Sequence, residues 1–129
     1  MKKYYVISAI IFFVKMNATA QNWLWERNAT VTYHTYGNCT ATDITGNVFI
    51  GGHFFSHHLI LGNTNITNTD TVNSFADLYL AKYDPNGTLL WAVSASGTNS
   101  DIINSVAVDA AGNVYVTGKF RSPSINFGS

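Results

Sequence analysis

Three histidines lie close together in the sequence, and imidazole is the side chain that most often ligates metal ions in proteins. They are His53, His57 and His58. Because side chains alternate along an extended chain, His53 and His57 would lie on one face of a strand. A metal site would also need ligands from outside this segment. We therefore expect a surface role for these histidines and no metal site.

The carboxylates are the next candidates, because hydrolases that cleave sugar chains work with a pair of them. Asp43, Asp84 and Asp109 each begin a four-residue stretch that ends in glycine, and an aspartate in such a turn accepts hydrogen bonds from backbone N–H groups. Asp77 opens a predicted strand. The remaining acids do not recur at the repeat offset described below: Glu26, Asp70 and Asp101. The sequence therefore predicts no catalytic carboxylate pair.

Nucleophilic and calcium-binding patterns are also missing from the sequence. There is no G-x-S-x-G motif, and the single cysteine, Cys39, is expected to be a buried thiol. The Asn- and Asp-rich residues 63–70 fit neither the spacing of an EF-hand loop nor the glycine-rich nonapeptide that binds calcium. We interpret residues 62–75 as a polar loop. The sequence thus predicts no catalytic residue, no metal and no cofactor.

Aromatic side chains provide the remaining candidate for a binding surface, because their rings can stack on a ligand while their polar ends stay in water. The candidates are Trp23, Tyr33 and Tyr36. Trp25 is excluded because it recurs in the repeat and is expected in the core.

The elements that would position these residues come from an internal repeat with an offset of 66 residues. The segments 43–54 and 109–120 both read D-x-x-G-N-V-[FY]-[IV]-x-G-x-F. The same offset relates Trp25 to Trp91, outside the matched segments and without a gap. The repeat signature is Trp25, Asp43, Gly46, Asn47, Gly52 and Phe54 in the first copy, and Trp91, Asp109, Gly112, Asn113, Gly118 and Phe120 in the second.

Each period contains short strands separated by tight turns. Asp84-Pro-Asn-Gly87 combines a proline that fixes φ with a glycine that permits positive φ, which predicts a hairpin. Strands are expected near 77–84, 88–96, 103–109 and 113–120. Four antiparallel strands per repeat, covered on both faces by neighbouring copies, describe a β-propeller blade. The sequence predicts an all-β protein of β-propeller-type blades, each a four-stranded antiparallel sheet, with about two blades, incomplete, after a signal peptide.

The repeat motif, together with the hairpin D-L-Y-L-A-K-Y-D-P-N-G-x-L-L-W, resembles the bacterial β-propeller repeat called SBBP. The resemblance covers residues 25–129, with a first repeat over about 25–90 and a second, truncated repeat over about 91–129. It implies a large exported or surface protein with further repeats of the same chain, and many such proteins come from bacteria that use type IX secretion. It implies no established activity and no catalytic residue.

The first 20 residues have the layout of a secretory signal peptide. Two lysines precede the apolar run 6–14, and Ala18-Thr-Ala20 ends the segment. The apolar run is too short to cross a bilayer, which takes roughly 20 residues. Cleavage would leave residues 21–129 with four basic and seven acidic residues and a formal charge of −3. We expect secretion or surface exposure, no membrane span after cleavage and no nucleic-acid partner.

These observations predict a non-catalytic secreted or cell-surface propeller that binds an extracellular protein or a glycan. The alternatives are a structural spacer and an accessory domain of a secreted polysaccharide-degrading enzyme. A sorting domain alone in the full-length protein would favour adhesion, many more repeats would favour the spacer, and an appended hydrolase domain would favour the accessory role.

Overall fold

A computed structural model describes residues 24–68 and 75–128, and within these ranges the chain contains strands and no helix. The predicted signal peptide, Trp23 and Asp70 lie outside the described residues. The first five strands are β1 (Ala29–Val31), β2 (Thr35–Thr42), β3 (Val48–Phe54), β4 (His58–Leu61) and β5 (Thr64–Thr67). The others are β6 (Asp77–Tyr83), β7 (Leu89–Ser96), β8 (Asp101–Val108), β9 (Val114–Phe120) and β10 (Asn126–Phe127).

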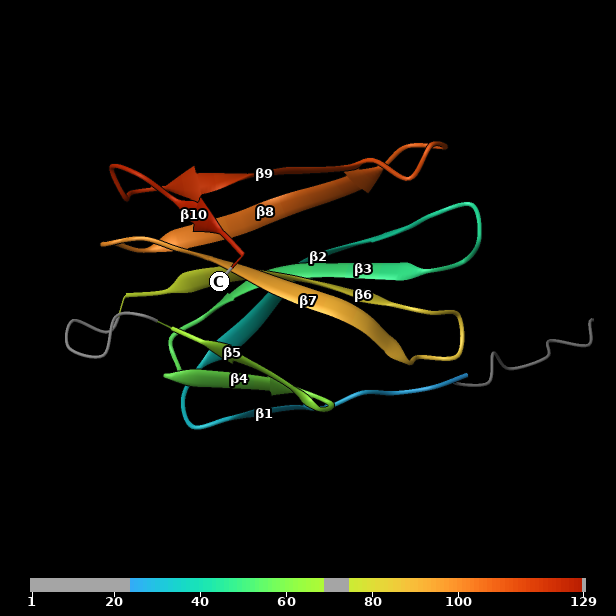
Figure 1. Cartoon of the computed structure of the whole chain (residues 1–129), viewed down its shortest axis with the longest axis horizontal. Helices are drawn as coiled ribbons and strands as arrows, with labels where there is room; N and C mark the ends of the chain where they lie inside the picture. Colours follow the sequence, from blue (N-terminus) through green and yellow to red (C-terminus); the bar gives the residue numbers. More distant parts are fainter. Residues whose placement is uncertain (1–23, 69–74, 129) are drawn as a thin grey trace, which may run out of the picture.

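The strands form three antiparallel sheets that lie on one another as layers (Figure 1). We call them the lower sheet, in the order β1-β4-β5, the middle sheet, in the order β10-β7-β6-β3-β2, and the upper sheet, β8-β9. In Figure 1 the middle sheet lies between the other two. Several antiparallel sheets with both faces of the central one covered are the arrangement of incomplete propeller blades.

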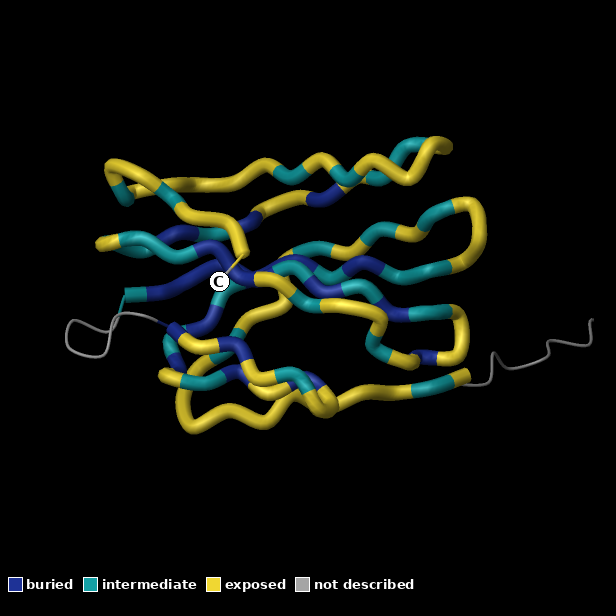
Figure 2. The backbone as a smooth tube through the Cα atoms, viewed as in Figure 1, coloured by how far each residue is buried: buried dark blue, intermediate teal, exposed yellow. Residues whose placement is uncertain are grey.

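Alternation along β6 explains how the middle sheet packs on both neighbours. Tyr79, Ala81 and Tyr83 point to one face and form a buried cluster with Leu59, Leu61 and Ile66 of the lower sheet. Leu78 points to the opposite face and packs with Ala95 and with Ile103 of the upper sheet. Figure 2 shows the buried residues concentrated in the middle of the stack, whereas β1 and β9 are mostly exposed.

The 66-residue offset of the sequence is repeated in the strand pairing. Ala29 pairs with Leu61 in the lower sheet, and the residues that follow them by the offset, Ala95 and Phe127, pair in the middle sheet. The β2–β3 and β8–β9 hairpins are equivalent in the same way. Each contains a register shift at the corresponding place, between Gly37 and Cys39 in β2 and between Ile103 and Ser105 in β8.

The strands themselves lie where the sequence predicts them, but their grouping into blades is different. We expected residues 77–120 to supply the four strands of one blade. Instead β6 and β7 pair with β2 and β3, whereas β8 and β9 form the start of a separate sheet. The offset identifies equivalent strands, but it does not determine which neighbouring hairpins share a sheet.

The interpretation of residues 62–75 as a polar loop is wrong for its first part. Gly62, with a φ of 58°, turns the chain between β4 and β5, and Ile66 of β5 is buried in the lower cluster. The Thr and Asn residues around Ile66 face outward, which hides the strand in the composition. Residues 69–74 lie outside the described part.

Candidate functional site

The two tyrosines predicted as a binding surface lie together at one end of the β2–β3 hairpin. With their neighbours they form an aromatic cluster, defined as Tyr33, His34, Tyr36, His53 and Phe55. The Tyr36 and His53 rings lie on directly paired residues of β2 and β3 and stack with centroids 4.8 Å apart and an interplanar angle of 15°. Tyr33 and Tyr36 are 58% and 47% exposed. The cluster therefore presents aromatic surface to solvent.

His34 and Phe55 complete the cluster, although the sequence analysis did not single them out. The His34 ring centroid lies 4.3 Å from that of Tyr33 and 6.3 Å from that of Tyr36. Phe55 stands edge-on to both Tyr36 and His53. The signal that could have identified them is the strand register, since both flank the hairpin ends at which Tyr36 and His53 lie.

Asn38 fixes the orientation and protonation of His53. The Asn38 Nδ2 lies 3.0 Å from His53 Nδ1 and donates a second hydrogen bond, of 2.7 Å, to the Ile103 carbonyl oxygen of the upper sheet. An imidazole nitrogen that accepts a hydrogen bond carries no proton. Burial also lowers the pKa of His53. Both effects favour the neutral ring.

The other two histidines lie elsewhere. The His57 and His58 rings contact each other with centroids 4.3 Å apart, and His57 Nδ1 lies 3.2 Å from the Asn68 carbonyl oxygen. Within residues 24–68 and 75–128, no three His, Cys, Asp or Glu side chains are grouped so that they could hold a metal ion. The structure thus places His53 in the aromatic cluster and separates it from the other pair.

The turn aspartates accept hydrogen bonds within their own turns. Asp109 Oδ1 accepts from the backbone N–H groups of Ala111 and Asn113, and its Oδ2 accepts from Asn113 Nδ2. The Asn113 side chain is the largest cause of a lowered Asp109 pKa. Asp43 and Asp84 make the equivalent backbone contacts. The carboxylates of all three aspartates therefore stabilise their own turns.

Cys39 is half-buried between β3 and the upper sheet. Burial raises the pKa of its thiol, and its Sγ lies 3.6 Å from the Gly51 carbonyl oxygen. A thiol with a raised pKa is a poor nucleophile at neutral pH. Its surroundings are those of a packing residue.

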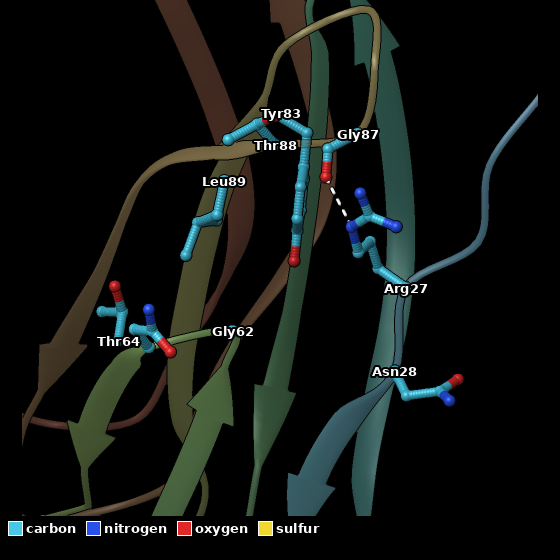
Figure 3. Close-up of a pocket in the computed structure, with 9 residues that line it drawn as sticks. Arg27, Asn28, Gly62, Thr64, Tyr83, Gly87, Thr88 and Leu89 are labelled. Atoms are coloured by element: carbon cyan, nitrogen blue, oxygen red, sulfur yellow. Dashed lines mark hydrogen bonds between the residues drawn. The ribbon is translucent and has the colours of Figure 1, made fainter.

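A cleft that the sequence analysis did not anticipate lies between the lower and middle sheets (Figure 3). Its volume is about 290 Å³. Three segments line it: the residues before β1, the β4–β5 turn, and the β6–β7 hairpin. The lining residues are Arg27, Asn28, Gly62, Asn63, Thr64, Tyr83, Gly87, Thr88 and Leu89.

The residues before β1 are attached to the β6–β7 hairpin at this cleft. Trp25 stacks on Tyr83 with ring centroids 5.8 Å apart, and its Nε1 donates to the Pro85 carbonyl oxygen at 3.1 Å. Arg27 Nε donates to the Gly87 carbonyl oxygen at 2.6 Å. Gly87 has a φ of 79°, and a Cβ on it would lie 2.6 Å from the Trp25 ring. The turn glycine is therefore needed for both its φ and its contact.

Comparison with known proteins identifies the repeat. Residues 95–119, from the end of β7 through β9, match the family SBBP, described as a beta-propeller repeat. The chain is also similar to a WD repeat-containing protein of Acanthamoeba polyphaga mimivirus, with 36% identity over 64 residues, which are 50% of this chain and 4% of that relative. No solved structure gives a significant match. Together with the three stacked antiparallel sheets, these matches show that the chain contains a β-propeller repeat of the SBBP type, at residues 95–119.

Proposed function

We propose that the chain is an exported, non-catalytic propeller segment that binds a glycan through the aromatic cluster. The observation that supports this most directly is the exposed, parallel stack of Tyr36 on His53. Tyr33 and His34 extend the same surface beyond Tyr36.

The chemistry of the cluster suits a sugar better than a protein partner. The C–H-bearing face of a pyranose ring is apolar and packs on an aromatic ring, whereas its hydroxyl groups need nearby hydrogen-bonding side chains. Tyr33 and Tyr36 supply both rings and hydroxyl groups. The rigid Tyr36–His53 pair is held by the β2–β3 register and by Asn38, so little conformational entropy is lost on binding.

Export is the second part of the proposal and is supported by residues 1–20, whose charged start, apolar run and Ala-Thr-Ala end are those of a signal peptide. Glycans outside the cytoplasm are the ligands that such a protein would meet. A non-catalytic role is supported by the local hydrogen bonding of the turn aspartates and by the packed thiol of Cys39.

Affinity electrophoresis of the exported chain against a panel of soluble bacterial and plant polysaccharides tests this proposal. Protein recovered outside the cytoplasm of a host bacterium should begin at Gln21. We expect Tyr36→Ala to weaken the best ligand by about tenfold, because one stacked aromatic contact is worth roughly 0.5–1.5 kcal/mol beyond its buried area.

Tyr115→Ala is the matched control, since Tyr115 is 57% exposed on β9, outside the aromatic cluster. It should bind like the unmodified chain. Equal affinities for Tyr36→Ala and Tyr115→Ala, or no retardation by any polysaccharide, would contradict the proposal.

A further inference from the structure

The cleft between the lower and middle sheets combines two features that point to a ligand. It contains a guanidinium group held in place by backbone oxygens and, beside it, a tyrosine hydroxyl to which none of the described residues forms a hydrogen bond. Neither feature belongs to the repeat signature, and the cleft is distinct from the aromatic cluster.

Arg27 supplies the cation. Two of its five N–H groups donate to backbone oxygens, one to the Gly87 carbonyl at 2.6 Å and one to the Glu26 carbonyl at 2.7 Å. These bonds fix the guanidinium group at the edge of the cleft and leave Nη2 free to donate. Among the described residues no carboxylate forms an ion pair with Arg27, since the ion pair found there joins Lys82 and Asp43.

Tyr83 supplies the hydroxyl group. Its side chain is only 5% exposed, because Trp25 covers one face of the ring and the lower cluster surrounds the remainder. Figure 3 shows the ring extending along the cleft between Leu89 and Arg27, with the hydroxyl pointing into it. This hydroxyl has no hydrogen-bond partner among the described residues. Because the hydroxyl faces the open cleft, a ligand oxygen could replace water as its partner, and such a hydrogen bond contributes about 0.5–1.5 kcal/mol net.

The other walls of the cleft are suited to alcohol groups. Asn28, Asn63, Thr64 and Thr88 carry amides and hydroxyls that can donate and accept, and Leu89 offers an apolar wall. The volume, about 290 Å³, lies at the lower end of the roughly 300–1,000 Å³ of small-molecule sites. A single sugar ring fits this scale better than a longer ligand.

We propose that this cleft binds one acidic sugar unit, a hexuronate, with its carboxylate at Arg27 and its ring hydroxyls at Tyr83 and the polar wall. Arg27 matches a carboxylate because the guanidinium group presents planar, directed donors to it.

A singly charged ligand is favoured over a doubly charged one by the neighbouring Asp84. The Asp84 carboxylate accepts from the Asn86 and Thr88 backbone N–H groups at 2.9 and 2.7 Å and stays close enough to Arg27 for the two charges to interact. The hydrogen bond from Thr88 is the largest cause of its lowered pKa, so it remains ionised at neutral pH. A dianion such as phosphate would be repelled by this charge more strongly than a carboxylate.

Isothermal titration of the full chain with D-glucuronate, D-glucose and inorganic phosphate tests the ligand class. We expect glucuronate to bind, and glucose and phosphate to bind at least about fivefold more weakly, since each loses either the charge-assisted bond or the fit to the polar wall. Equal binding of glucose and glucuronate, or tighter binding of phosphate, would overturn the proposal. So would the absence of binding heat with glucuronate at roughly 20 mM, which is about 20 times a millimolar Kd.

Two variants locate the site. Tyr83→Phe removes only the hydroxyl and keeps the stack on Trp25, so the fold is retained, and glucuronate affinity should fall about fivefold. Arg27→Gln removes the charge and should lower affinity at least about tenfold. Arg121→Gln is the matched control, because Arg121 follows β9, outside the cleft lining, and it should bind glucuronate unchanged.

The two proposals of this protein can fail separately. Unchanged glucuronate affinity in both Tyr83→Phe and Arg27→Gln would overturn the assignment to the cleft, whatever the polysaccharide result for Tyr36→Ala. Loss of glucuronate binding in Tyr36→Ala alone would also overturn it, because the ligand would then be bound at the aromatic cluster.

Discussion

In the first copy of the repeat the Tyr33 backbone N–H donates to Ser56 Oγ at 2.9 Å, and in the second the Asn99 N–H donates to Ser122 Oγ at 2.9 Å. The Ser56 hydroxyl donates back to the Tyr33 carbonyl oxygen, and Ser122 Oγ lies 3.2 Å from the Asn99 carbonyl oxygen, although its single proton is shared with the closer Asp101 Oδ2. Ser122 follows Ser56 by the 66-residue offset, and Asn99 follows Tyr33 by the same offset. The backbone framework is thus set by a small number of side chains that recur, whichever residue occupies position 33 or 99.

The two copies differ where the framework leaves side chains free. The five residues of the aromatic cluster correspond by the offset to Asn99, Ser100, Ile102, Lys119 and Arg121. The second copy therefore has the same hairpin without an aromatic surface. The same hairpin thus carries two different surfaces. The aromatic side chains of the first copy are therefore a candidate for function, whereas the hairpin that holds them is common to both copies and is not.

The largest effect should come from breaking a contact that both copies share. Gly52 and Gly118 each lie where a Cβ would collide with a backbone carbonyl oxygen, that of Tyr36 or of Ile102. Because backbone cannot move aside without disturbing the strand pair, Gly52→Ala should lower the free energy of unfolding by about 3 kcal/mol or more. Gly118→Ala should cost less, about 2 kcal/mol, since the two-stranded upper sheet has more room to shift.

Urea unfolding followed by tryptophan fluorescence measures these costs. Gly37→Ala is the control, because Gly37 pairs directly with Gly52 while a Cβ on it would meet only side-chain atoms at ordinary contact distance, the Tyr79 hydroxyl at 3.7 Å and Ile50 Cγ2 at 4.0 Å. It should change stability by less than about 1 kcal/mol. Similar losses for Gly37→Ala and Gly52→Ala would show that the close approach is not the cause.

The second effect concerns a position at which the copies differ, Asp101 and its counterpart Thr35. Asp101 is 0% exposed and accepts from the Arg121 and Ser122 backbone N–H groups and from Ser122 Oγ. The Thr35 hydroxyl is buried and has no hydrogen-bond partner among residues 24–68 and 75–128. Asp101→Ala leaves the two backbone N–H groups unsatisfied, whereas the Ser122 hydroxyl can still donate to the Asn99 carbonyl oxygen, and the change should cost about 2–3 kcal/mol. Thr35→Val removes an unsatisfied hydroxyl and should be neutral or stabilising by up to about 1 kcal/mol.

Thermal unfolding of the two variants beside the unmodified chain compares them directly. Asp101→Asn keeps an acceptor oxygen and should recover part of the loss. A destabilising Thr35→Val would mean that its hydroxyl has a partner, such as an ordered water molecule, and that the two copies satisfy this corner in different ways.

The sequence predicts strands well here because turns and alternation are local properties. Residues 77–84 and 113–120 were expected as strands and are β6 and β9 to within one residue. The lower-sheet hairpin was missed because Ile66 is the only large apolar side chain of β5. Sheet membership was also missed, because β3 pairs with β6 across an intervening hairpin that the offset does not reveal.

The candidate sites, like the strands, could be predicted only where they depend on residues close together in the sequence. Tyr33 and Tyr36 could be proposed from the sequence because they are close in it, but their stacking with His53 depends on the β2–β3 register. Arg27 and Gly87 are 60 residues apart, and their hydrogen bond depends on how the lower and middle sheets pack. The one sequence feature that pointed toward the cleft was Trp25. Its recurrence at Trp91 indicated a packing role, and in the structure it lies against Tyr83. A site formed within one hairpin could therefore be predicted from the sequence, and a site formed between two sheets could not.

The smallest effect is expected at a turn that both copies share, where Asp43 and Asp109 are hydrogen-bonded by the side chains of Asn47 and Asn113. The asparagine amide is the largest cause of the lowered pKa of each aspartate. A carboxyl whose pKa is lower in the folded than in the unfolded chain stabilises the fold above its unfolded pKa, about 3.9, and this contribution is lost as the pH falls through the folded pKa.

Asn113→Ala should therefore raise the pKa of Asp109 toward its ordinary value and leave that of Asp43 unchanged, as seen by carbon-detected NMR titration of the two carboxyl groups. The stability lost by this variant should be present at pH 7 and should shrink below about pH 4, where the unmodified chain also loses the contribution of the ionised group. An Asp43 pKa that moves together with that of Asp109 would mean that the turns are coupled through the stacked sheets. Independent shifts would instead show that each copy of the repeat stabilises its own turn, as the separate hydrogen bonds of Asn47 and Asn113 indicate.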